Sequence, residues 1–109
     1  MTDAAAARTP YRGRPVRPPP MSGPLCSHLD AIATVTGPRQ RVCDECVRIG
    51  ARWVHLRTCQ TCGATLCCDS SPNRHASRHA AASGHPVVAS AEPGERWLYC
   101  YPDDLTAAY

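Results

Sequence analysis

Short apolar stretches that alternate with polar positions recur along the chain and predict β-strands. The clearest is RWVHLRT at residues 52–58, which alternates apolar and polar side chains and is rich in strand-forming residues. Four further stretches have a similar character: AIATVT (31–36), ATLCC (64–68), HPVVAS (85–90) and RWLYCY (96–101). Turn-forming sequences such as GPR and EPGE separate them, so we expect a small antiparallel sheet.

Two segments carry helix signals instead. CDECVRIGA, at residues 43–51, has room for one or two short helical turns. A longer helix is predicted at residues 72–82, because Ser71 can cap its start, its first residue is proline, and Gly84 can end it. The predicted fold is therefore α+β: a small antiparallel sheet with one clear helix and several metal-binding knuckles.

Residues 1–24 differ from the rest of the chain in composition. They hold six of the 11 prolines and carry a charge of +3, whereas residues 26–109 hold eight arginines and eight acidic residues. A segment so rich in proline and arginine cannot build a packed core, so we predict a disordered or polyproline-like tail. The folded domain is expected at residues 25–109.

The chain has no stretch of the roughly 20 apolar residues needed to span a bilayer, and residues 1–25 contain no visible signal peptide. We therefore expect a cytoplasmic protein with no membrane partner. Eight cysteines and five histidines in 109 residues then favour metal sites, because disulfides are rare in a reducing compartment. A chain this short also buries a modest core and often needs such cross-links.

The cysteines and histidines fall into clusters with metal-ligand spacing. Two Cys-x-x-Cys pairs are the most specific signal, because two thiolates at this spacing can reach one tetrahedral ion. Two of three later histidines, His75 and His79, would share one face of the predicted helix, one turn apart. The candidate ligands are Cys26, His28, Cys43, Cys46, Cys59, Cys62, Cys67 or Cys68, His75, His79, His85, Cys100 and Asp103.

The number of ligands argues for structural sites. If one cysteine of the Cys67–Cys68 doublet binds, 12 ligands are present, enough for three closed four-ligand sites. Thiolate and imidazole sets of this kind favour zinc. No position is left for a catalytic water, so we do not expect an enzyme. His55 lies outside the clusters and is expected to be a surface or strand histidine.

The order of these motifs resembles the UBP-type zinc finger, the ubiquitin-binding zinc finger found beside deubiquitinases and in one histone deacetylase. The resemblance covers residues 26 to about 104 and includes CxH, CxxC, a tryptophan, CxxC-x4-C, H-x3-H-x5-HP and a final W and CY. It implies an α+β domain with up to three zinc ions. The Lys-free, Arg/Ala/Pro-rich composition is typical of a GC-rich bacterial genome, so the chain looks like a stand-alone bacterial member.

The resemblance also implies which residues share a zinc ion. The three sets are Cys26, His28, Cys100 and Asp103; Cys43, Cys46, Cys67 and His75; and Cys59, Cys62, His79 and His85. The family commonly has a cysteine where Asp103 stands.

The Cys67–Cys68 doublet leaves two assignments open. Counting forward from Cys62 favours Cys67, because the family keeps four residues in that gap, whereas counting back from His75 favours Cys68. We prefer Cys67, because insertions belong in the polar loop at residues 69–74 more than in a strand. Neighbours in a strand face opposite sides, so the other cysteine is expected to be a buried thiol.

Eukaryotic members of the family hold a free C-terminal Gly-Gly carboxylate in an aromatic pocket, with an arginine that follows the third-cluster cysteine. Three aromatic residues stand near the matching positions: Trp53, Trp97 and Tyr101. Asp69 follows the Cys67–Cys68 doublet, near the position of that arginine, and would repel a carboxylate unless Arg74, Arg78 or backbone N–H groups substitute.

We therefore expect a zinc-binding recognition module that binds a protein or peptide C-terminus in an aromatic pocket. The alternative is a nucleic-acid-binding zinc protein whose arginine-rich tail contacts phosphates. The balanced charge of residues 26–109 disfavours it, because nucleic-acid-binding domains usually have a basic face.

Overall fold

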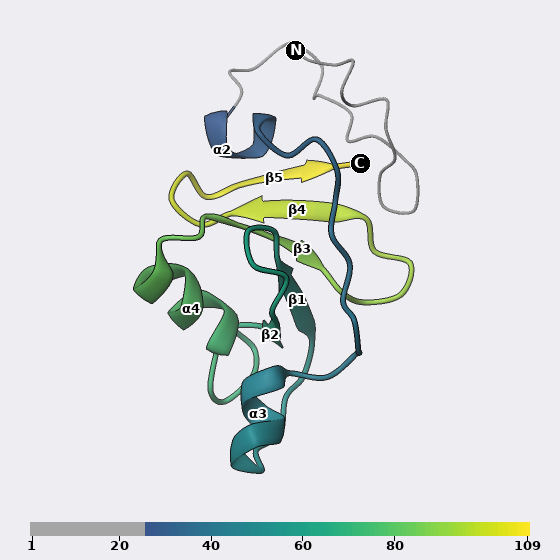
Figure 1. The fold of residues 1–109 in the computed structure, drawn as a ribbon, viewed down its shortest axis with the longest axis vertical. Helices are drawn as coiled ribbons and strands as arrows, with labels where there is room; N and C mark the ends of the chain where they lie inside the picture. Colours follow the sequence, from purple (N-terminus) through teal and green to yellow (C-terminus); the bar gives the residue numbers. More distant parts are fainter. Residues whose placement is uncertain (1–25) are drawn as a thin grey trace.

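The computed structural model describes residues 26–109, which form a single sheet with three helices packed against it (Figure 1). In chain order the elements are α2 (Ser27–Asp30), α3 (Asp44–Ile49), β1 (Leu56–Cys59), β2 (Thr65–Cys67), α4 (His75–Ser83), β3 (Val87–Ser90), β4 (Trp97–Cys100) and β5 (Leu105–Ala108). The predicted tail, residues 1–24, lies outside the described residues. No helix within residues 26–109 is long and apolar enough to cross a membrane.

The strands pair antiparallel throughout, in the order β2-β1-β3-β4-β5. Helix α4 packs on β1 and β2, α3 packs on β2, and α2 packs on β4. In Figure 1, α3 and α2 therefore lie toward opposite ends of the sheet. The arrangement confirms the predicted α+β fold with a small antiparallel sheet.

The prediction of a strand at residues 31–36 is wrong. The segment is irregular, although Val35 is buried and packs in the core. The backbone N–H of Thr36 donates to Gln60 Oε1 at 2.7 Å, and its carbonyl accepts from Gln60 Nε2 at 2.9 Å. One side chain thus satisfies the backbone groups that a neighbouring strand would otherwise pair with.

Four of the predicted strands are present but shorter than predicted. The RWVHLRT stretch is extended only from Leu56, because the N–H of Val54 donates to the side chain of Ser71 at 2.8 Å instead of joining a ladder. Two elements, α2 and β5, had no sequence signal: α2 has four residues, and β5 has mostly exposed side chains with no apolar alternation.

The short helix predicted within residues 43–51 is confirmed as α3. The Cys43 sulfur accepts the N–H of Cys46 at 3.3 Å and so caps the start of the helix. Gly50 ends it with a left-handed backbone conformation (φ 73°), which glycine adopts at no steric cost. A cysteine at the cap and another in the first turn bring two sulfur atoms to one end of α3.

Helix α4 is present, but it begins at His75 and not at Pro72. Ser71 does not cap it, because the Ser71 side chain accepts the N–H of Val54. The N–H of His75 instead donates to the sulfur of Cys67 at 3.2 Å, at the end of β2. The intervening loop therefore serves to bring the first residue of α4 against β2.

The core formed by residues 26–109 consists of two clusters, and both contain cysteines of the candidate metal sites. One surrounds Leu56, Leu66, Ala76 and Ala91, and includes three buried cysteines. The other contains apolar residues of β3 and β4, Val35 and two further cysteines. Because the aliphatic part of each cluster is small, we expect the fold to depend on ligation of these cysteines.

Candidate functional site

The structure gathers the predicted ligands into three groups of four, and in each group the ligand atoms lie within 4.8 Å of one another. We name them the core group (Cys43, Cys46, Cys67 and His75), the helix group (Cys59, Cys62, His79 and His85) and the terminal group (Cys26, His28, Cys100 and Asp103). Their membership coincides with the three sets that the resemblance implies. The groups interleave along the chain, so each joins segments that are distant in sequence.

The core group brings three sulfur atoms around one imidazole nitrogen. His75 Nδ1 lies 3.4 Å from Cys43 Sγ, 3.4 Å from Cys46 Sγ and 3.5 Å from Cys67 Sγ. The sulfur atoms of Cys46 and Cys67 are 3.9 Å apart. A tetrahedral ion bonded to sulfur at about 2.3 Å and to nitrogen at about 2.0 Å requires S···N separations of roughly 3.5 Å and S···S separations of roughly 3.8 Å. The group therefore has the dimensions of a closed tetrahedral metal site.

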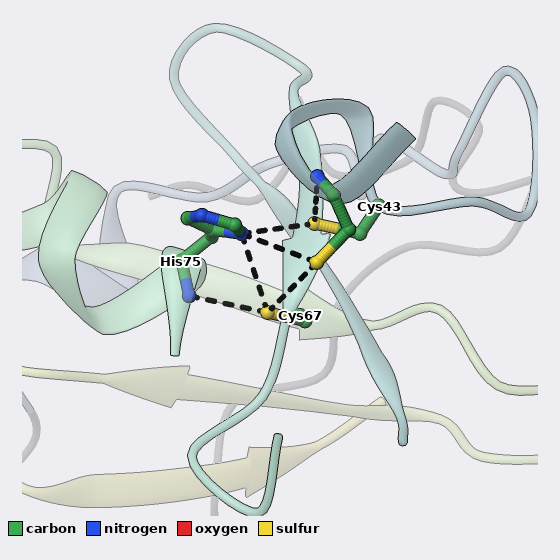
Figure 2. A group of neighbouring side chains, drawn as sticks. Cys43, Cys67 and His75 are labelled. Carbon is green, nitrogen blue, oxygen red and sulfur yellow. Dashed lines mark hydrogen bonds between the residues drawn. The ribbon is translucent and has the colours of Figure 1, made fainter. Parts of the chain in front are cut away.

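Three different elements supply the core group. Figure 2 shows the ring of His75, at the start of α4, turned toward the sulfur atoms of Cys43 and Cys67. Cys43 and Cys46 come from the start of α3, and Cys67 ends β2. All three cysteines are fully buried. One metal ion here would fix α3, β2 and α4 relative to one another.

Cys68 lies outside all three groups. Its sulfur accepts the N–H of Ser70 at 3.3 Å and lies 3.7 Å from the hydroxyl oxygen of Ser71. Burial opposes ionisation of this thiol, but the hydrogen bonds from Ser70 and Ser71 outweigh it and lower the Cys68 pKa to about 7. The structure thus places Cys67 in the core group and Cys68 on the opposite side of the chain.

The helix group contains two sulfur atoms and two imidazole nitrogens. Cys62 Sγ lies 3.4 Å from His79 Nε2, and Cys59 Sγ lies 3.5 Å from His85 Nδ1. The two nitrogens are 3.2 Å apart. Burial, and then the neighbouring His85, lowers the pKa of His79 and favours the neutral imidazole that binds a metal.

A glycine-dependent turn positions the two cysteines of the helix group. The N–H of Gly63 donates to the Cys59 carbonyl at 2.9 Å, and the N–H of Cys59 donates to Ala64 at 2.8 Å. Gly63 has a φ of 81°, in the left-handed region where other residues are strained. The Cys-x-x-Cys-Gly sequence is therefore the turn between β1 and β2, which directs both sulfur atoms toward α4.

The terminal group joins Cys26 and His28, at the start of α2, to the hairpin between β4 and β5. His28 Nδ1 lies 3.6 Å from Cys26 Sγ, 3.4 Å from Cys100 Sγ and 3.1 Å from Asp103 Oδ2. Asp103 Oδ2 approaches Cys26 Sγ to 2.8 Å, closer than the roughly 3.5 Å of two ligands on one tetrahedral ion. Contact with the Cys26 thiol, and then with His28, holds the pKa of Asp103 below its ordinary value.

The chemistry of the donors fits zinc. Burial, and then contact with Cys43 and Cys67, raises the pKa of Cys46 to about 12, and burial is the largest cause that raises the pKa of Cys100 to about 11. Crowded thiols resist ionising together, so a cation is needed to stabilise them as thiolates. Closed four-ligand sets of sulfur and imidazole donors are those that structural zinc prefers.

Comparisons with known proteins agree with this geometry. Residues 43–107 match the model of a family described as "Zn-finger in ubiquitin-hydrolases and other protein". The chain belongs to the UBP-type zinc-finger family. This zinc finger is also similar to a protein from Rhodopseudomonas palustris solved by NMR in solution, with 46% sequence identity and a TM-score of 0.68 over 79% of this chain and 83% of that chain. A search of curated proteins finds no match.

Zinc is the cofactor of this UBP-type zinc finger. The family is a zinc-finger family, and the three groups are close enough to hold up to three ions. The core, helix and terminal groups are the residues that would hold them. His55, the one histidine of the described residues outside these groups, has an exposed side chain.

The zinc finger also has a hollow on the face of its sheet, with a volume of about 450 Å³. It is lined by Arg57, Cys68, Asp69, Val88, Trp97, Tyr99, Tyr101, Thr106 and Ala108. Strand register explains much of this set: Val88 opposes Tyr99, Tyr99 opposes Thr106, and Trp97 opposes Ala108, so their side chains share one face. We call this hollow the aromatic pocket.

Arg57 is the cation of the aromatic pocket. Its guanidinium carbon lies 4.6 Å from the centroid of the Trp97 ring, and its Nη1 donates to the carbonyl of Leu56 at 2.9 Å. The rings of Tyr99 and Tyr101 meet edge to face, with centroids 5.0 Å apart. Sequence reasoning missed Arg57, because nothing in the sequence indicates that β1 pairs with β3 and so brings this side chain toward Trp97.

Only some of the residues predicted for the pocket line it. Trp97 and Tyr101 line the aromatic pocket, whereas Trp53 packs against the core cluster around Leu56 and is absent from the lining. Neither of the arginines that we considered as substitutes, Arg74 and Arg78, lines it.

Proposed function

We propose that this zinc finger is a recognition module that binds the C-terminus of a protein or peptide in the aromatic pocket, with zinc holding the fold. The observation that carries the proposal is the stack of Arg57 on Trp97 inside the pocket. A guanidinium can donate two parallel hydrogen bonds to a carboxylate, and the aromatic rings offer an apolar wall to the last residues of a peptide. Arg57 could thus take the role of the arginine that is missing beside Asp69.

The donor sets support binding over catalysis. Each of the three groups has four ligands, which fills a tetrahedral ion, whereas catalytic zinc keeps a position for water. The balanced charge of residues 26–109 also favours a peptide over nucleic acid, whose binding usually needs a basic face.

The test is a fluorescence titration of the zinc-loaded protein with peptides that end in Gly-Gly. Each peptide is used as the free acid and as the amide, and Trp97 in the pocket reports binding. We expect the free acid to bind about 10 to 100 times more tightly, because a hydrogen bond to a charged group contributes about 1.5–3 kcal/mol. Equal affinity for acid and amide would contradict the proposal.

Two matched variants identify the arginine that receives the carboxylate. Arg57→Gln removes the guanidinium over Trp97, whereas Arg78→Gln removes an exposed guanidinium of α4 that does not line the pocket. We expect Arg57→Gln to abolish the difference between acid and amide and Arg78→Gln to preserve it. The reverse result would assign the carboxylate to another site.

A further inference from the structure

We infer that the aromatic pocket selects a peptide C-terminus whose last residue has a positively charged side chain, with the carboxylate at Arg57 and the side-chain cation at Asp69. The inference rests on the proposed function, because it names the class of C-terminus that the same pocket takes. It follows from two opposite charges that line one pocket and do not pair with each other.

The hydrogen-bond and ring partners of Arg57 and Asp69 are neutral groups, and the charge of Arg57 also contributes to the lowered pKa of Cys68 in the same lining. The Arg57 guanidinium stacks on Trp97 and donates to a backbone carbonyl. Asp69 is exposed, and its Oδ1 accepts the hydroxyl of Ser77 at 2.7 Å. Neither residue takes part in the ion pairs found in residues 26–109. A carboxylate accepts about four hydrogen bonds and a guanidinium donates five, so both charges keep free capacity for a ligand.

Two tyrosine rings lie with these charges in the pocket lining. Tyr99 and Tyr101 pack edge to face, and the Tyr99 hydroxyl donates to Asp104 at 2.7 Å. Asp69 and Arg57 line the same pocket as both rings. Aromatic faces attract cations electrostatically, so a carboxylate beside tyrosine rings is a favourable place for an ammonium group.

The pocket has room for a side chain. Its volume of about 450 Å³ lies within the range of about 300–1,000 Å³ of pockets that enclose small ligands. A Gly-Gly end has no side chain to fill it. Small residues of β5, Thr106 and Ala108, form one wall, and β5 is an edge strand of the sheet (Figure 1), so a longer peptide can leave the pocket over this edge.

The experiment compares free-acid peptides that differ only in their last residue: lysine, norleucine, glutamate or glycine after a common sequence that ends in glycine. Norleucine matches the aliphatic part of lysine without its charge. We expect lysine to bind about three to ten times more tightly than norleucine, as an exposed ion pair with an aromatic contribution predicts. Glutamate should bind most weakly, and added salt should reduce the preference for lysine.

Asp69→Asn isolates the charge, because its amide oxygen can still accept the Ser77 hydroxyl. The preference for lysine over norleucine should fall to about one in this variant, while the Gly-Gly free acid still binds. Asp30→Asn is the matched control: Asp30 is an exposed aspartate of α2 that does not line the pocket, and its replacement should leave the preference unchanged.

The outcomes separate the two proposals. If lysine and norleucine peptides bind equally, or if the preference survives in Asp69→Asn, the inference is overturned, while acid-dependent binding of Gly-Gly still supports the proposed function. If no free acid binds more tightly than its amide, the proposed function is contradicted and the inference with it. Preference for lysine that is lost in Asp69→Asn and retained in Asp30→Asn supports both.

Discussion

The core group and the terminal group each collect four ligands, yet they lie in different surroundings. The three cysteines of the core group are fully buried and join α3, β2 and α4. In the terminal group the side chains of His28 and Asp103 are 37% and 42% exposed, and a carboxylate oxygen replaces the third sulfur. Both groups place cysteines in the hydrophobic core, but the terminal group completes its set with two partly exposed ligands.

A cross-link that closes a longer loop removes more entropy from the unfolded chain and so stabilises the fold more. By loop length alone the terminal group, which joins residues 77 apart, would stabilise the fold more than the core group, whose most distant members are 32 apart. Loop-closure entropy grows only as the logarithm of length, so this advantage is about 0.8 kcal/mol. Burial and the softness of the sulfur ligands favour the core group, and their effect on stability is larger than this entropy difference. Three buried sulfur atoms are stable as thiolates only when a cation binds them. We therefore expect the core group to dominate stability.

Removal of zinc should have the largest effect. Structural zinc contributes on the order of 10 kcal/mol per site in small zinc peptides, comparable to the whole stability of a domain. We expect exhaustive chelation to unfold residues 26–109, measured by circular dichroism. With a limiting amount of chelator, the terminal group should lose zinc before the core group. A native-like spectrum after complete chelation would contradict a metal-dependent fold.

Adjacent cysteines give the sharpest mutational comparison. Cys67→Ser removes a buried sulfur from the core group and should destabilise the fold by about 3–5 kcal/mol, as loss of one partner of a buried charged set does. Cys68→Ser alters a thiol outside the groups and should cost about 1 kcal/mol or less. Chemical denaturation and zinc content of the two variants measure this. Equal loss of zinc in both would contradict the assignment of Cys67 to the core group.

Acid should release zinc from the helix group as His79 takes up a proton. Burial, and then His85, lowers the pKa of His79 from 6.5, so the stability due to its neutral form is fully present above pH 6.5. That stability is lost as the pH falls through the lowered pKa of the folded state, because the unfolded chain binds the proton more readily. Melting temperature and dye-detected zinc release from pH 8 to 5 test this. His55→Ala should leave the profile unchanged, since His55 is exposed and outside the groups.

Periodicity and ligand spacing predicted most of the framework. Short alternating stretches predicted β1 to β4, and the Cys-x-x-Cys pairs predicted metal-binding knuckles, one of which is the turn at Gly63. The start of α4 could not be predicted, because a sulfur of a distant strand replaces the serine cap. The segment at residues 31–36 resembles a strand locally, but its partner is the side chain of Gln60, which is a tertiary contact.

The metal ligands could be predicted from the sequence, whereas the full lining of the aromatic pocket could not. Cysteine and histidine have few other reasons to cluster, so their spacing indicated which residues could be ligands, and the family resemblance then implied which of them share an ion. Arg57 is chemically ordinary and becomes a pocket residue only because its side chain shares a face with Val88 and Trp97. Strand order and register decide this, and neither is visible in a sequence of short strands.

The smallest predicted effect concerns the ligand that distinguishes the terminal group. Asp103→Asn keeps an oxygen at this position but removes its charge, and should weaken zinc binding there by about 10- to 100-fold, as changes around a metal commonly do. Asp103→Cys should strengthen it, because a third thiolate suits zinc better than a carboxylate. Both variants should fold, since the core group is untouched. Competition titrations with a chelating dye measure the affinities, and global unfolding of Asp103→Asn would mean that the terminal group matters as much for the fold as the core group.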